Sequence, residues 1–216
     1  MTTIIKKKNL TIFNSKNIYF ANNLMFANLK KKILSRNNIY ISGGKSLNLL
    51  LKKINKEKKI VASFFLTDEK LSNNKEKKNI FNIEKRVKMK IIKFDYSSYK
   101  NLNNLKLYCN KNLPNPDFAF IGIGEDGHVA SIFNYKNCKE NFFLCKKKEE
   151  NFRRISISEK MLLRSNQINI FLNKKSKNIF FSRLFKNNTY SMDSIPIIRI
   201  CKKFKRKINI YTYNFA

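Results

Sequence analysis

Short apolar runs alternate along the chain with stretches of helical periodicity. Apolar residues recur at three- and four-residue steps through positions 16–34, which predicts an amphipathic helix with Ser15 as its N-cap. Positions 60–66 form a continuous apolar run, typical of a strand buried on both faces of a parallel sheet. The other predicted strands are 10–13, 39–41, 89–94, 117–122, 154–158, 168–172 and 207–213, and the other predicted helices are 45–54, 79–87, 96–109 and 176–184.

This order of elements predicts the class of fold. Strand and helix alternate nearly throughout, so we expect a parallel α/β sheet with helices on both faces, a three-layer arrangement. A length of 216 residues suits a single domain, 1–216, with 207–213 as a small C-terminal extension of the sheet. Segment 154–158 alternates apolar and polar residues and is expected to be a half-exposed strand. Segment 134–152 is polar and lysine-rich and is expected to be a surface excursion.

Glycine is confined to two places. The chain has 5 glycines, whereas an average usage of roughly 7% would give about 15. Gly43 and Gly44 follow the predicted strand 39–41, and the others lie at 122, 124 and 127, at the end of the predicted strand 117–122. A chain so poor in glycine keeps it where a side chain is not allowed, so we expect a ligand site at the carboxyl edge of the sheet.

The formal net charge of +32 would ordinarily indicate a nucleic-acid or anionic-surface partner. Lys, Asn, Ile and Phe are abundant, however, while Gly, Pro and Ala are scarce, which is typical of codon usage biased towards adenine and thymine. We therefore expect a solvated lysine surface that draws small anions towards a cleft, and no specific nucleic acid. A basic nucleic-acid-binding protein, with 9 Tyr and 19 Phe for stacking, is the alternative from another class. Against it, basic and aromatic residues do not cluster on one predicted strand face.

Cysteine spacing and hydropathy bear on cofactors and compartment. The 4 cysteines form no CxxC pair, so no metal site is expected, and free thiols suit a reducing cytosol and a cytoplasmic protein. The apolar run 60–66 is too short to cross a bilayer, so no membrane partner is expected. The first acidic residue is Glu57, an acid-poor start like that of a transit peptide, but strand-like residues begin at Leu10 and leave little to cleave.

The first glycine turn, 42–46, reads Ser-Gly-Gly-Lys-Ser between a predicted strand and a predicted helix. Free backbone N–H groups and the helix dipole at such a place bind phosphate. A Walker A loop would need a further glycine five residues before Gly44, where this chain has Ile39, so that motif is excluded. A tight turn without a ligand is the alternative.

The second glycine turn, 121–131, contains the only histidine of the chain, His128. Asp126 or Glu125 could orient its ring and stabilise the imidazolium that forms in general base catalysis. Ser131 lacks the GxSxG context of a nucleophile, so we interpret it as a helix N-terminal or substrate-contact residue.

An acidic pair, Asp68 and Glu69, ends the predicted strand 60–66, where ligand-binding groups occur in parallel sheets. A surface acidic pair with no function is the alternative. Lys70 could pair with either carboxylate or with a phosphate.

Segments 41–46, 65–70 and 122–133 resemble, in order and spacing, the three signatures of the 6-phosphogluconolactonases. These enzymes belong to the glucosamine-6-phosphate isomerase/6-phosphogluconolactonase family. The resemblance implies a Rossmann-like fold and hydrolysis of the sugar-phosphate lactone 6-phospho-D-glucono-1,5-lactone to 6-phosphogluconate in the oxidative pentose phosphate pathway. It implies no metal and no cofactor, and a functional coupling to glucose-6-phosphate dehydrogenase.

The resemblance also assigns roles to residues. His128, oriented by Asp126, would activate a water molecule for attack on the lactone carbonyl. Backbone N–H groups of the first glycine turn would cradle substrate oxygens, and three cations would serve the phosphate and the developing oxyanion. The residues implied in binding are Ser42, Gly43, Gly44, Ser46, Asp68, Lys70, Gly124, Glu125, Arg154 and Lys177, and whether Arg153 or Arg154 faces the site stays open.

Departures from the pattern leave two further alternatives. Lys70 stands where the family has an arginine, so the bidentate fork of a guanidinium is lost. The glycine usual before Lys177 is also absent. An inactive lactonase is therefore one alternative. The other is the related glucosamine-6-phosphate deaminase, whose motif continues with Ala-Phe-Asn-Glu-Pro. Here Phe133 stands in place of that glutamate and no acidic residue follows until Glu140, which favours the lactonase.

Overall fold

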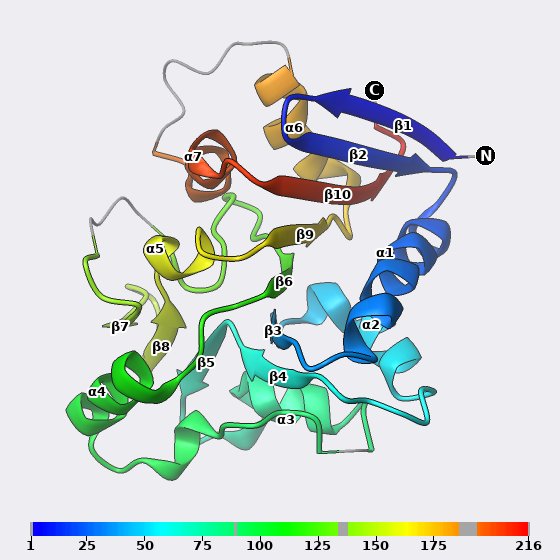
Figure 1. The fold of residues 1–216 in the computed structure, drawn as a ribbon. Coiled ribbons are helices and arrows are strands. Elements are labelled where there is room, and N and C mark those ends of the chain that lie inside the picture. The colour runs from blue at the N-terminus through cyan, green and yellow to red at the C-terminus, as the bar shows by residue number, and fades with distance from the viewer. Residues whose placement is uncertain (1, 89, 134–137, 186–193, 216) are drawn as a thin grey trace.

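The computed structural model describes residues 2–88, 90–133, 138–185 and 194–215. Its main sheet has seven strands in the order β1-β2-β10-β9-β6-β3-β4, and all neighbours are parallel except β1 and β2 (Figure 1). The strands are β1 (Thr2–Lys7), β2 (Leu10–Ser15), β3 (Asn38–Ile41), β4 (Ser63–Leu66), β6 (Phe118–Gly122), β9 (Gln167–Phe171) and β10 (Lys207–Tyr213). The expected C-terminal strand thus joins the sheet, and it lies between β2 and β9.

A second, three-stranded antiparallel sheet has the order β5-β8-β7. Its strands are β5 (Asp68–Leu71), β7 (Phe142–Cys145) and β8 (Arg153–Ile157). Thr67 alone separates β4 from β5, so the chain passes from one sheet into the other at this residue. The acidic pair expected at a strand end therefore begins a new strand.

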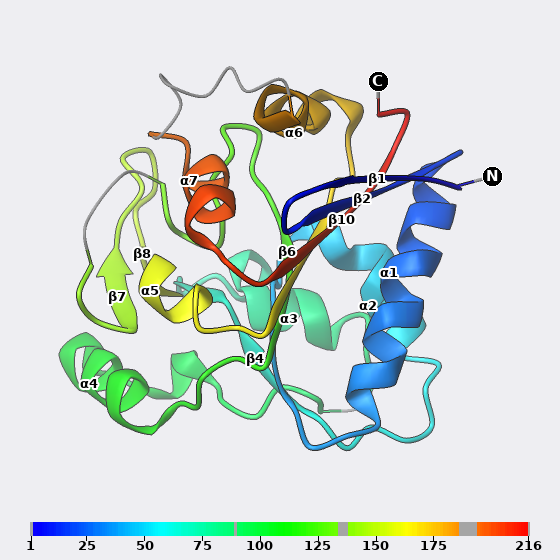
Figure 2. The same ribbon diagram turned by 45° about the horizontal axis from the view of Figure 1, so that its top comes forward.

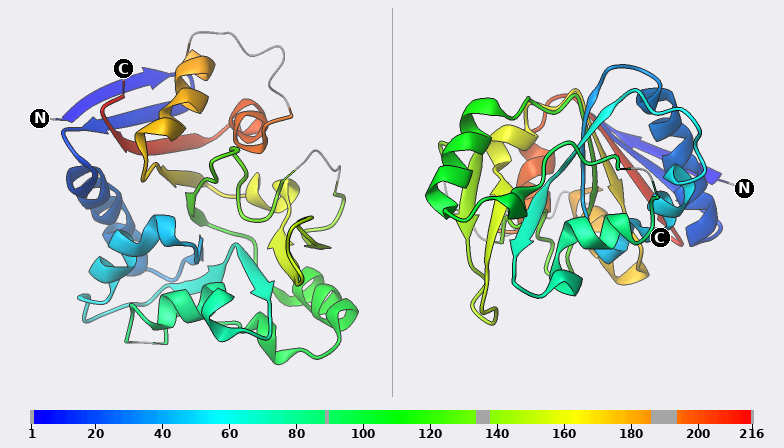
Figure 3. Two further views of the ribbon diagram at one scale, coloured as in Figure 1. Left: turned by 180° about the vertical axis from the view of Figure 1, so that it is seen from behind. Right: turned by 90° about the horizontal axis from the view of Figure 1, so that it is seen from below.

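Helices cover both faces of the main sheet, as the alternation of elements predicts. Helices α1 and α2 lie on one side and α5 and α7 on the other (Figures 2 and 3). The helices are α1 (Ile18–Ile33), α2 (Asn48–Ile54), α3 (Asn79–Glu84), α4 (Leu102–Asn112), α5 (Glu159–Leu162), α6 (Asn178–Phe185) and α7 (Pro196–Lys203). Single 3-10 turns occupy Lys45–Leu47, Lys75–Lys77, Tyr96–Ser98 and Lys175–Lys177. The core forms where the apolar stripe of α1, including Met25, Leu29 and Ile33, is buried against the sheet.

The predicted strand 89–94 and the predicted N-cap of the first helix are both wrong. Between 90 and 94, Ile92 forms only an isolated bridge with Phe64, so the predicted strand is absent there, and Met89 lies outside the described residues. The segment is apolar because it packs on the core and not because it pairs. The N-cap of α1 is Asn17, whose side-chain oxygen accepts the N–H groups of Tyr19 and Phe20, whereas Ser15 belongs to β2.

Burial corrects two further expectations. Residues 154–157 are all buried, so β8 is not a half-exposed strand. It lies between β5 and β7, and its polar side chains meet partners inside the protein. The polar stretch 134–152 is more than a surface excursion because it contributes β7, although 134–137 lie outside the described residues. The elements β1, α5 and α7 were not predicted.

Candidate active site

A cavity of about 280 Å³ is lined by residues that follow β3 and β6 and by residues of β5 and β8. All the predicted site residues line it except Gly43 and Asp126. Asn79, Gly122, Ile123 and Ala130 also line the cavity. Gly122, Ile123 and Ala130 belong to the second glycine turn, 121–131, whereas the sequence did not single out Asn79. Segments far apart in the chain converge here because neighbouring parallel strands end at the same edge of the sheet.

The turn after β6 holds His128 against Asp126. Oδ1 of Asp126 lies 2.5 Å from Nδ1 of His128 and accepts the backbone N–H of His128 at 3.2 Å. Burial alone would raise the pKa of Asp126, but these hydrogen bonds and the imidazole hold this pKa below its ordinary value. Asp126 therefore engages Nδ1, and the other ring nitrogen, Nε2, is left for a proton transfer.

Two glycines allow this turn. A Cβ at Gly124 would lie 2.1 Å from Nδ1 of His128, so any side chain there would displace the ring. Gly127 has φ +81°, in the left-handed region that favours glycine, and its N–H donates to the carbonyl of Gly124 at 3.2 Å. The scarcity of glycine in the sequence was therefore a sound indicator of where the backbone approaches the histidine.

The other acidic residue of this turn, Glu125, does not orient the histidine. Its carboxylate pairs with Nζ of Lys174 at 2.7 Å on the surface. Lys177 is buried and donates to the carbonyl of Ile123 at 2.6 Å and to Oδ1 of Asn173 at 2.9 Å. Burial lowers the pKa of Lys177, although the charge of Glu125 acts in the opposite sense. Asn173, near the position where the family has a glycine, thus anchors this ammonium group.

The first glycine turn, 42–46, has two unlike glycines. A Cβ at Gly43 would lie 2.5 Å from Cβ of Asn79, so this glycine permits the close packing of α3 and does not open a path to the cavity. Gly44 lines the cavity, and a Cβ there would meet no atom within 4 Å. The expected helix 45–54 begins as a 3-10 turn, and α2 proper starts three residues later.

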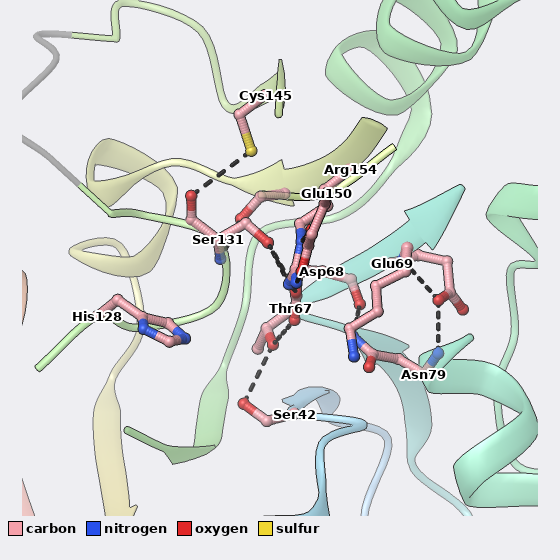
Figure 4. Close-up of polar contacts among 12 residues, drawn as sticks. Ser42, Thr67, Asp68, Glu69, Asn79, His128, Ser131, Cys145, Glu150 and Arg154 are labelled. Atoms are coloured by element: carbon pink, nitrogen blue, oxygen red, sulfur yellow. Dashed lines mark hydrogen bonds and ion pairs between the residues drawn. The ribbon is translucent and has the colours of Figure 1, made fainter. Parts of the chain in front are cut away.

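The cavity-facing side of β5 and β8 is polar (Figure 4). Oγ of Ser131 donates to Oδ2 of Asp68 at 2.7 Å, and Nη1 of Arg154 lies 3.6 Å from the same oxygen. Arg154 is buried and lines the cavity, whereas Arg153 is exposed. Ser131 is therefore a support for Asp68, and Arg154 is the arginine that faces the site.

Glu69 has a different role from its neighbour Asp68. Its carboxylate is fully buried and accepts the N–H groups of Lys70, Asn79 and Ile80 at 2.7, 2.6 and 2.8 Å (Figure 4). Burial raises the pKa of Glu69 to about 7, against the opposite effect of these three hydrogen bonds. The strand alternation is the signal that separates the pair, because Asp68 and Lys70 share one face of β5 and Glu69 faces α3.

Phe133 stands beside the candidate base. Its ring centroid lies 4.9 Å from that of His128, and the guanidinium carbon of Arg154 lies 5.4 Å from the same ring. The Phe133 ring therefore contacts both His128 and Arg154, two residues that line the cavity. Phe133 cannot take or give a proton.

Neither a metal-binding cluster nor a membrane-spanning helix occurs within the described ranges. Among those residues, no group of three or more His, Cys, Asp or Glu side chains could hold a metal ion. No helix in the described part of the chain is long and apolar enough to cross a membrane.

Comparisons with known proteins relate this site to one family. Residues 19–208 match the family model described as glucosamine-6-phosphate isomerases/6-phosphogluconolactonase. A 6-phosphogluconolactonase of Helicobacter pylori is 27% identical over 114 residues, which cover 50% of this chain and 49% of that protein. The chain thus spans about half the length of this curated relative.

Solved structures share the fold at low identity. A 6-phosphogluconolactonase from Thermotoga maritima has a TM-score of 0.76 and 17% identity, covering 96% of this chain and 100% of that one. The 6-phosphogluconolactonase from Plasmodium vivax has a TM-score of 0.74 and 18% identity, covering 98% of this chain and 94% of that one. The α/β arrangement with a mostly parallel central sheet is therefore that of these proteins.

Proposed function

Because this chain belongs to the family of glucosamine-6-phosphate isomerases and 6-phosphogluconolactonases, we propose that it hydrolyses 6-phospho-D-glucono-1,5-lactone to 6-phosphogluconate. The observation that carries the proposal is the His128–Asp126 pair, whose ring borders a cavity that three cationic side chains also line. These cations are Lys70, Arg154 and Lys177, and they suit an anionic sugar phosphate.

His128 is the general base in this proposal. With Nδ1 bonded to Asp126, Nε2 takes a proton from a water molecule whose oxygen attacks the lactone carbonyl carbon. The carboxylate of Asp126 stabilises the imidazolium that results. The tetrahedral intermediate then collapses with cleavage of the bond from this carbon to the ring oxygen, and the imidazolium returns its proton to that oxygen.

The three cations serve two different groups of the substrate, the reacting carbonyl and the phosphate. Lys177 is tied to the carbonyl of Ile123, in the same turn as His128, so we assign it to the developing oxyanion. Lys70 and Arg154 lie opposite each other on β5 and β8, and we assign them to the phosphate. No step requires a metal or a cofactor.

Phe133 favours lactone hydrolysis over sugar-phosphate deamination. In the deaminases a glutamate at this position takes part in ring opening. The aromatic ring beside His128 offers no such group, whereas hydrolysis of an already cyclic ester needs none.

The biological setting is part of the same proposal. The lactone is the product of glucose-6-phosphate dehydrogenase, so we propose a functional coupling in which this chain consumes it. The four cysteines, which form no CxxC pair, suit the reducing cytoplasm in which we place the reaction.

The test generates the lactone in situ with glucose-6-phosphate dehydrogenase and follows its disappearance by NMR with and without this protein. We expect the lactone to disappear faster than its spontaneous hydrolysis, in proportion to the protein concentration. A rate equal to the spontaneous one at every concentration would refute the proposed activity, and turnover of glucosamine 6-phosphate instead would favour the deaminase.

A further inference from the structure

Two cations face each other across β5 and β8. Lys70 and Arg154 are paired residues in the antiparallel register, and both line the cavity. Cross-strand partners have Cβ atoms about 4.5–5.5 Å apart, and like charges directly opposite repel. An anion between or beside the two side chains therefore stabilises the pair.

Glu150 supplies that anion. It belongs to the connection between β7 and β8, and its carboxylate takes both hydrogens of one edge of Arg154, from Nε at 2.7 Å and from Nη2 (Figure 4). Burial alone would raise the pKa of Glu150, but the guanidinium of Arg154 and the charge of Lys70 hold this pKa below its ordinary range. Glu150 is thus an ionised partner of Arg154, and its charge is also attracted by that of Lys70.

The guanidinium has no free edge in this arrangement. Its Nη1 faces Asp68 and Ser131, and the rings of Phe133 and Phe152 lie 5.4 and 5.7 Å from its central carbon. A phosphate could bind Arg154 through its bidentate fork only at an edge that a carboxylate now holds.

We propose that Glu150 is a specificity-determining residue, a resident carboxylate that the phosphate monoester of the substrate must displace from Arg154, opposite Lys70. The inference rests on the proposed function because it takes the displacing group to be the substrate's phosphate. A phosphate dianion carries about two charges and three acceptor oxygens, so it competes with a carboxylate where a neutral lactone cannot. Glu150 thereby raises the threshold for binding and rejects lactones that lack the phosphate.

The test measures binding without turnover. Calorimetric titration with inorganic phosphate and with 6-phosphogluconate would compare the wild type with Glu150→Gln. We expect the dissociation constant to fall about five- to thirty-fold in the variant, because the competing charge is gone. Glu149→Gln is the matched control: it removes the same charge from the same connection, but Glu149 is 70% exposed and its carboxylate pairs with Nζ of Lys147 at 3.5 Å.

A second variant distinguishes phosphate binding at this site from phosphate binding elsewhere on the basic surface. The gain in phosphate affinity should disappear when Lys70→Met is added to Glu150→Gln, since one of the two cations is then missing. In the wild type, titration with phosphate should also shift the NMR resonance of the Arg154 Nε–H group, which needs no mutation and no assumption about folding.

Weaker or unchanged phosphate binding in Glu150→Gln would overturn the inference and make Glu150 a support for Arg154. An equal gain in Glu149→Gln would overturn it as well. The proposed function is judged separately by lactone turnover of the wild type. Tighter phosphate binding in Glu150→Gln without any turnover would refute the activity and leave the displacement intact.

Discussion

Gly124 and His128 are in contact across the turn that follows β6. The N–H of Gly124 donates to the carbonyl of His128 at 2.9 Å, and a Cβ on Gly124 would lie 2.2 Å from Cε1 of the imidazole. The same Cβ would lie 2.7 Å from Oδ1 of Asp126. The absence of a side chain at one residue therefore fixes where both the ring and its carboxylate partner lie.

The substitution Gly124→Ala should lower kcat for the lactone by roughly 10²-fold or more, because the methyl group displaces the ring from its catalytic position. The free energy of unfolding should change little, since the turn is at the surface of the cavity. The measurement is lactone turnover together with chemical denaturation. Gly44→Ala, whose Cβ would meet no atom within 4 Å, should lose less activity, and an equal loss in both variants would contradict the steric explanation.

Glu69 predicts a pH dependence of stability. Its pKa in the folded protein is about 7, raised from 4.5 by burial. The folded state therefore binds the proton more tightly than the unfolded state, so the stability that Glu69 contributes is fully present below about pH 4.5 and is lost as the pH rises through about 7.

The measurement is chemical denaturation of the wild type and of Glu69→Gln at pH 5 and pH 8. The variant has one fewer acceptor oxygen for the N–H groups of Asn79 and Ile80, so it should be destabilised, by roughly 1–3 kcal/mol. The loss should be larger at pH 5 than at pH 8. Glu84→Gln, at the exposed end of α3, should show no such difference between the two pH values. An equal loss of stability at pH 5 and pH 8 for Glu69→Gln would refute the raised pKa.

The net charge of +32 predicts a salt dependence that separates two kinds of binding. Binding to duplex DNA should be weak, independent of sequence and steeply reduced by salt, as counterion release requires. For the lactone, kcat/KM should lose only the part due to long-range steering, because the contacts in the cavity are short-range. Fluorescence anisotropy with DNA and turnover assays over the same range of salt provide the comparison. Tight, sequence-selective DNA binding at physiological salt would favour the nucleic-acid-binding alternative.

The parallel sheet and the cavity were predictable because both leave local signals. Buried parallel strands are continuous apolar runs, and glycine is required where the backbone meets His128 or packs on Asn79. The signal did not distinguish Gly43, whose missing side chain serves packing, from Gly44, which borders the cavity. Both follow the same strand, and only the position of α3 separates them.

Only one strand of the second sheet, β8, was predicted from the sequence. Its strand β7 lies in a lysine-rich stretch, and β5 begins one residue after β4, so the apolar pattern shows one strand end and not a change of sheet. Two of the six residues of the edge strand β1 are lysines, as is common on edge strands, which face solvent. The contact of Glu150 with Arg154 depends on the hairpin that joins β7 to β8, so neither residue alone predicts it.

The most direct test of the proposed mechanism replaces the imidazole with an amide that cannot act as a base but can still donate a hydrogen bond to Asp126. His128→Asn should lower kcat roughly 10²–10⁴-fold, the contribution of a positioned general base, with KM nearly unchanged because the cations remain. Asp126→Asn should lower kcat in the same direction, since an amide cannot stabilise the imidazolium. Near-wild-type kcat in a folded His128→Asn variant would contradict the account, because water activation would then not depend on His128.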